Sequence, residues 1–239
     1  MIAELSSVLG KGELDRSLLH VFVAGPGTGE GVLVALPDTK GWIAVDGCKV
    51  GAEGCLDSLL LEMKGEDEPL ALLVLTHPHE DHAAGIPELL ERYQPTEVLV
   101  TADSPVGKNL VEQAGGWLTA QKHAATDAGL TLKHATAALV AIASWADANP
   151  GRLVAGADGT TRNYGRVELA VRASQAGPHL SSVLGEIAEG NRARANEASV
   201  VLELVFGKTR VVLGGDMPCK RPDGTKVPTG WDAVLGVYP

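Results

Sequence analysis

Short apolar runs alternate with turn-forming residues over the first hundred positions of the chain. The runs 18–24, 31–36 and 42–45 are β-rich and are separated by Gly, Pro and Asp, a pattern typical of paired strands. The run 70–75 is apolar at every position, which indicates a strand buried on both faces. Another strand is predicted at 97–101. Helical spacing of apolar residues predicts helices at 56–64 and 83–93, on either side of the buried strand.

The pattern changes in the second half of the chain. Residues 105–150 have a helical pattern, broken near Gly115–Gly116 and Gly129, and form either a packed helical layer or an insertion. Strands are predicted at 153–155, 167–171, 200–206 and 210–213, and 178–196 is expected to be a flexible segment. Along the chain, strands come first, then strands that alternate with helices, then helices, and then strands again. This order predicts a layered α/β fold. We expect residues 1–239 to form one domain.

Composition and charge narrow the function classes. Hydrophobic residues make up 45% and charged residues 21% of the 239 positions, as in ordinary globular proteins. The sequence contains no run of about eighteen apolar residues, so no membrane-spanning helix is expected. The start of the sequence lacks a signal-peptide pattern, so a cytoplasmic location without membrane association is expected. A net charge of −10 argues against tight non-specific binding of nucleic acid. Cys48, Cys55 and Cys219 form no CxxC pair and are expected to be buried thiols, with Cys48 of interest because it follows Asp46.

The strongest chemical signal follows the buried strand. The segment THPHEDH at 76–82 places four side chains that bind metals within six positions: His77, His79, Asp81 and His82. A strand that ends here and a helix that begins here would gather them around one loop. A surface loop with scattered histidines is the competing interpretation, and the density of ligands disfavours it.

This HxHxDH motif resembles the central signature of the metallo-β-lactamase superfamily. Two further segments fit: WIAVDG resembles the first motif, in which Asp46 would support the metal loop, and RVVLGGDMP resembles the segment whose carboxylate, here Asp216, bridges two metals. The resemblance implies a four-layer αββα sandwich. Residues 25–48 and 196–216 are also similar to the hydrolase domain of competence DNA-uptake proteins, a branch of this superfamily.

The resemblance implies two divalent metal ions, zinc as the expected ion and manganese as the alternative. His77, His79 and Asp216 would hold one ion, and Asp81, His82 and Asp216 the other, while His179 is a candidate additional ligand. The expected chemistry is hydrolysis by a metal-bound hydroxide, which Asp81 would help to orient. The histidine that the superfamily places after its bridging carboxylate is lacking, because no histidine follows Asp216. The sandwich is therefore expected to be incomplete at its C-terminal end.

The substrate is left open by the sequence. The branch resemblance favours a phosphodiester, in a nucleic acid or a small molecule. The alternatives are a non-catalytic or truncated domain of this fold with a regulatory or binding role, and a hydrolase of esters, thioesters or lactams. A groove lined with Lys or Arg would favour the phosphodiester, and a narrow apolar pocket would favour the acyl substrates. The oligomeric state is not indicated.

Overall fold

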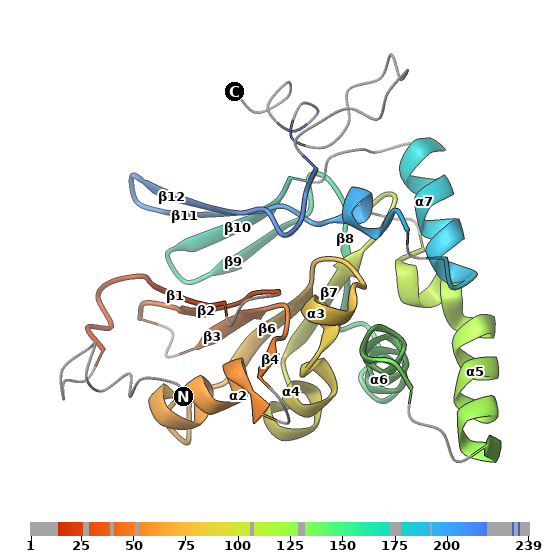
Figure 1. The fold of residues 1–239 in the computed structure, drawn as a ribbon. Coiled ribbons are helices and arrows are strands. Elements are labelled where there is room, and N and C mark those ends of the chain that lie inside the picture. The colour runs from red at the N-terminus through yellow and green to blue at the C-terminus, as the bar shows by residue number, and fades with distance from the viewer. Residues whose placement is uncertain are drawn as a thin grey trace.

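The fold was examined in a computed structural model, which describes residues 14–25, 29–38, 41–50, 53–105, 108–128, 132–172, 178–191, 193–218, 231 and 234. Two sheets lie face to face, and helices cover the outer face of the larger one (Figure 1). The predicted α/β sandwich is therefore confirmed, and the described residues form three of its four expected layers. No helix among them is long and apolar enough to cross a membrane.

The larger sheet has six strands in the order β1-β2-β3-β6-β7-β8. The first three strands are antiparallel, and β3, β6, β7 and β8 are parallel. Parallel neighbours require crossover connections, and the intervening helices supply them. The strand bounds are β1 His20–Ala24, β2 Gly31–Ala35, β3 Trp42–Val45, β6 Leu70–Leu75, β7 Glu97–Thr101 and β8 Leu153–Gly156.

Both faces of this sheet are buried, because successive side chains of a strand point to opposite faces. In β2, Leu33 packs in the core shared with the helices, and its neighbour Val34 packs in the core between the sheets. In β3, Ala44 and Ile43 divide in the same way. This two-sided burial explains why β6 is apolar throughout, as predicted.

The helices among the described residues are α2 Cys55–Met63, α3 Glu80–Ala83, α4 Ile86–Tyr93, α5 Leu110–Ala128, α6 His134–Ala148 and α7 Pro178–Ala188. Helices α2, α4 and α6 pack on the outer side of the six-stranded sheet, whereas α7 packs on α5 near the end of the smaller sheet (Figure 1). Helix α6 contacts α3 and α4, and α5 lies between α6 and α7. The segment predicted as a layer or an insertion thus packs as an ordinary helical layer.

The smaller sheet is an antiparallel meander in the order β12-β11-β10-β9. Its inner face supplies Val167, Leu169 and Leu202 to the core between the sheets. Its bounds are β9 Thr161–Tyr164, β10 Val167–Val171, β11 Leu202–Phe206 and β12 Thr209–Leu213, and the short 3₁₀ helix η1 Ala195–Ala198 precedes β11.

Three local predictions were wrong. The expected flexible segment 178–196 contains helix α7, whose Leu180, Val183, Leu184 and Ile187 are buried at helical spacing. The expected break at Gly115–Gly116 does not occur, because packing of α5 against two helices outweighs the low helix propensity of glycine. The helix predicted at 83–93 is divided by Gly85, which has a left-handed φ of 97°.

Strand β9 and a small hairpin of β4 Lys49–Val50 and β5 Glu53–Gly54 were also not predicted. Both are short and partly exposed or polar, so they carry little hydrophobic pattern.

Candidate metal centre

Asp46 and the predicted metal loop 76–82 lie where the parallel strands of the larger sheet end. Asp46 directly follows β3, and the loop from Thr76 directly follows the neighbouring strand β6. The second sheet is joined at the same place, because the Thr76 carbonyl accepts hydrogen bonds from the Val200 backbone amide at 3.0 Å and from the Thr101 hydroxyl at 3.0 Å. The loop is therefore held by both sheets.

Asp46 is the buried anchor of this loop. Its backbone adopts a left-handed φ of 58°, which is uncommon for a residue other than glycine and is found where tertiary contacts enforce it. Its carboxylate accepts hydrogen bonds from the Thr76 backbone amide (2.7 Å), from the Thr76 hydroxyl (2.6 Å) and from His82 Nδ1 (2.9 Å). Burial raises the pKa of Asp46, and the hydrogen bonds from His82 and Thr76 oppose that rise.

These hydrogen bonds determine the tautomers of two histidines. The Thr76 hydroxyl donates its proton to Asp46, so its oxygen must accept from His77 Nδ1, which lies 3.0 Å away. His82 likewise donates from Nδ1 to Asp46. In their neutral forms, both histidines therefore keep an unprotonated Nε2 as a potential ligand atom.

His77 Nε2 is buried and has no hydrogen-bond partner among the described residues. Burial lowers the pKa of His77 to about 2, and the nearby His82 and His79 add to this effect. The His77 ring centroid lies 4.4 Å from that of His82 and 5.0 Å from that of His79. A buried lone pair without a donor is costly, and a bound cation would satisfy it.

Asp216 is brought to the histidines by β12 of the smaller sheet. Gly215 precedes it with a φ of 51°, and a Cβ at Gly215 would lie 3.0 Å from the Thr76 hydroxyl oxygen. The two carboxylate oxygens of Asp216 face different histidines: Oδ1 is 3.2 Å from His82 Nε2, and Oδ2 is 3.9 Å from His77 Nε2. This is the arrangement that a carboxylate bridging two cations requires.

The pKa of His82 shifts in the opposite direction to that of His77. Burial lowers the pKa of His82, but the hydrogen bond and charge of Asp46, with the charges of Asp216 and Asp81, outweigh it and raise the pKa to about 9. Protein carboxylates thus compensate a positive charge at this position. A metal cation bound at Nε2 would take the place of that proton.

The described residues contain two groups of possible metal ligands, which share His77. His77, His79 and Asp216 place their ligand atoms within 4.8 Å of one another, as the first predicted site requires. Asp46, His77 and His82 form a second group, in which the Asp46 carboxylate already accepts three hydrogen bonds. Asp81 joins neither group among the described residues. It lines a cavity of about 410 Å³ together with His82 and Asp216.

Comparison with known proteins identifies the family of the chain. A family profile described as Metallo-beta-lactamase superfamily matches residues 17–171, which is more than half of the chain. The chain belongs to the metallo-beta-lactamase superfamily. The matched range includes the metal loop and Asp46, whereas Asp216 lies beyond it and is placed by the structure. No curated protein matches the chain.

Solved structures of metallo-beta-lactamases resemble the chain at low identity. One from Staphylococcus aureus subsp. aureus COL is 12% identical over 82% of this chain and 42% of its own, with a TM-score of 0.43. The Rm3 metallo-beta-lactamase is 15% identical over 98% of this chain and 74% of its own, with a TM-score of 0.43. A B3 metallo-beta-lactamase described as having an active-site glutamic acid is 15% identical over 81% of this chain and 57% of its own, with a TM-score of 0.41. This chain thus spans less than half the length of the first of these.

A divalent metal ion, which the superfamily typically binds, fits the residues present. The buried Nε2 of His77 lacks a donor, and imidazole and carboxylate are suitable ligands for zinc. Asp46 contacts His82 directly and His77 through the Thr76 hydroxyl, and its role behind the metal ligands stays a prediction. The imidazole and carboxylate donors that suit a divalent metal ion are therefore those of His77, His79, His82 and Asp216.

The remaining candidates are His179 and the three cysteines. His179 is in helix α7, and its side chain lies outside the described residues; Cys219 also lies outside them. Cys48 and Cys55 are buried free thiols, as expected. Burial, with the adjacent Cys55 thiol, raises the pKa of Cys48 to about 12, which disfavours a reactive thiolate.

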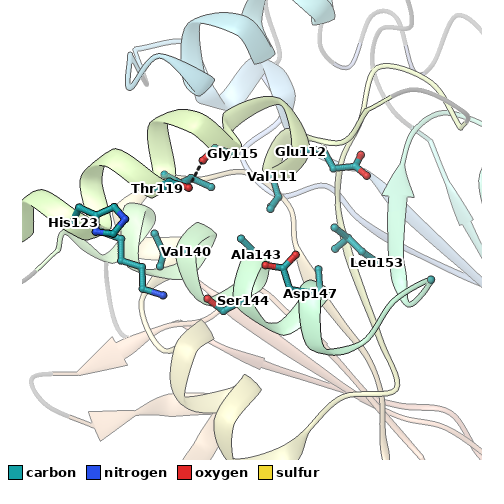
Figure 2. A pocket seen from close by; sticks show the side chains of 14 residues that line it. Val111, Glu112, Gly115, Thr119, His123, Val140, Ala143, Ser144, Asp147 and Leu153 are labelled. Atoms are coloured by element: carbon teal, nitrogen blue, oxygen red, sulfur yellow. Dashed lines mark hydrogen bonds between the residues drawn. The ribbon is translucent and has the colours of Figure 1, made fainter. Parts of the chain in front are cut away.

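A larger cavity, of about 620 Å³, lies between α5 and α6 (Figure 2). His123 lies at one end, and Glu112 and Asp147 lie toward the other, over an apolar floor that includes Val140 and Leu153. None of the predicted metal residues whose side chains the structure describes lines it. It is therefore separate from the metal centre.

Proposed function

We propose that the chain is a metal-dependent hydrolase whose centre holds two divalent ions, with zinc as the expected ion. The observation that carries this proposal is the pair of imidazole Nε2 atoms that face the two oxygens of Asp216. Divalent ions bound there would lower the pKa of a bound water and stabilise negative charge that develops in the bond under attack.

The protein's own residues would fix the geometry of this reaction. Asp46 and Thr76 orient the rings of His77 and His82 before any ion binds. Asp81 shares the cavity with His82 and Asp216, and we propose that its carboxylate accepts a hydrogen bond from the attacking water and orients it. Preorganised ligands of this kind reduce the reorganisation that the reaction requires.

A phosphodiester is the proposed bond, and it rests on the resemblance to the DNA-uptake branch. The described lining of the cavity contains no Lys or Arg to bind a phosphate, so the metal ions would have to hold a phosphodiester. This lining consists of Gly25, Gly29, Glu30, Asp81, His82, Gly215 and Asp216. This lack of basic side chains favours a carboxylic ester, thioester or lactam as the second candidate. We keep a cytoplasmic location as a prediction.

Metal content tests the centre first. Purified protein should contain about two equivalents of zinc per chain, and the His77→Ala, His79→Ala double variant should lose them. The matched control is the His123→Ala, His134→Ala double variant, which removes two helical histidines outside the centre. Well under one equivalent of zinc in folded wild-type protein would overturn the proposal.

Turnover tests the bond class. Zinc-loaded protein would be assayed with bis(p-nitrophenyl) phosphate, a single-stranded DNA oligonucleotide, p-nitrophenyl acetate, an acyl thioester and a chromogenic β-lactam. We expect hydrolysis of the phosphodiesters that a chelator abolishes. Hydrolysis confined to the acyl substrates would establish the second candidate, and a full zinc complement without turnover of any substrate would support a non-catalytic role.

A further inference from the structure

Glu30 is a carboxylate on the cavity wall that no sequence motif indicated. It lines the cavity beside Asp81, His82 and Asp216, although it comes from the turn before β2. Its carboxylate is exposed, and it makes no hydrogen bond or ion pair to the described residues. It is therefore available to a bound molecule.

The backbone of this turn is held in place by close contacts. Gly29 has a φ of 77°, and a Cβ there would lie 2.7 Å from the Cβ and the carbonyl oxygen of Asp81. A Cβ at Gly31 would lie 2.9 Å from the Leu56 side chain. Because Gly29 allows this close approach, the turn contacts the metal loop directly, which places Glu30 at the border of the cavity.

The carboxylates of Asp216 and Glu30, which both line the cavity, have different neighbours. Asp216 lies against His77 and His82, so its charge would be compensated by bound cations. The fully buried, unpartnered His77 Nε2 independently indicates that a ligand belongs there. Glu30 has no such partner in the described structure, and no Lys or Arg of the described lining balances it. Its negative charge would act on the substrate itself.

We propose that Glu30 selects substrates that carry a cationic group beside the bond that is cleaved. For a phosphodiester this means a zwitterionic substrate, whose phosphate lies at the metal centre and whose ammonium group faces Glu30. This inference rests on the proposed function, and it explains how a cavity without basic side chains on its described wall accommodates a phosphate ester. A second anionic group at the same position would be repelled.

Equilibrium binding tests the inference without requiring turnover. Calorimetric titration of zinc-loaded protein would compare phosphorylcholine with its carbon isostere, in which an uncharged tert-butyl group replaces the trimethylammonium group and the phosphate is unchanged. An exposed ion pair favours binding by a factor of about 1.4 to 5, so phosphorylcholine should bind more tightly by a factor in that range. The preference should disappear in Glu30→Gln, reverse in Glu30→Lys and shrink at high salt.

The matched control is Glu168→Gln. Glu168 is an exposed carboxylate in β10 that does not line the cavity, so this variant changes the net charge equally and should keep the preference. Equal binding of the two compounds to wild-type protein, or a preference that persists in Glu30→Gln, would overturn the role of Glu30 alone. Both compounds are phosphomonoesters of the kind that a phosphodiesterase releases, so failure of both to bind to zinc-loaded protein would overturn the inference, whereas the turnover assay with phosphodiesters tests the proposed function separately.

Discussion

Replacing Thr76 by valine tests the hydrogen-bond relay that prepares the metal ligands. Thr76 provides no ligand atom, but its buried hydroxyl links His77 Nδ1 to Asp46. Valine has nearly the same shape, so the variant removes the hydroxyl and leaves the packing. His77 Nδ1 then loses its acceptor, and the ring is no longer held in the tautomer that presents Nε2 to a cation.

The magnitude follows from these contacts. Loss of a supporting partner behind a metal-binding histidine typically reduces affinity by about 10- to 100-fold, and a buried donor left without an acceptor costs about 1–3 kcal/mol of unfolding free energy. We expect both effects in Thr76→Val, measured by zinc competition with a chromogenic chelator and by urea denaturation. Thr76→Ser keeps the hydroxyl and should retain most of the zinc affinity. Wild-type zinc affinity in Thr76→Val would refute the relay.

Three further predictions concern the same centre. Burial lowers the pKa of His77 in the folded protein from its ordinary value of 6.5 to about 2, so only the unfolded chain binds a proton there as the pH falls. Metal-free wild-type protein should therefore lose about 1.4 kcal/mol of unfolding free energy per pH unit below 6.5 through this residue. His77→Leu should not show this loss, as measured by urea denaturation at pH 7 and pH 5. Gly215→Ala should cost about 1–2 kcal/mol and reduce zinc binding, because it combines a positive φ with a close contact to Thr76; Gly207→Ala, which has a positive φ in open space, should cost stability without loss of zinc. Asp81→Asn should lower kcat at an unchanged zinc content, and loss of one zinc equivalent would instead identify Asp81 as a ligand.

The fold was predictable where burial produces a strong pattern. Strands β3, β6 and β7 have the predicted bounds, because two-sided burial requires apolar residues at nearly every position. Helix α7 was missed although its buried residues have helical spacing, since its serines and Gly185 were interpreted as signs of flexibility. The continuity of α5 through two glycines depends on its neighbours, which a local pattern does not contain.

The candidate site divides in a similar way. The structure brings together His77, His79, His82 and Asp216, four of the predicted ligands, and their role in binding metal stays a prediction. Glu30 belongs to no motif, and its place on the cavity wall follows from the contact between Gly29 and Asp81. A contact between segments so far apart in the sequence leaves no local signal.

The junction of the two sheets beneath Thr76 has a consequence for the order in which the protein assembles. Asp46 and the histidine loop belong to the first sheet, whereas Asp216 arrives with the last strand of the second. Contacts between distant segments form late, because closing long loops is entropically costly. The cation-binding constellation should therefore be completed only when the meander docks. During stepwise unfolding, release of the ion should precede loss of the six-stranded sheet, so a bound metal would report on the intactness of this seam.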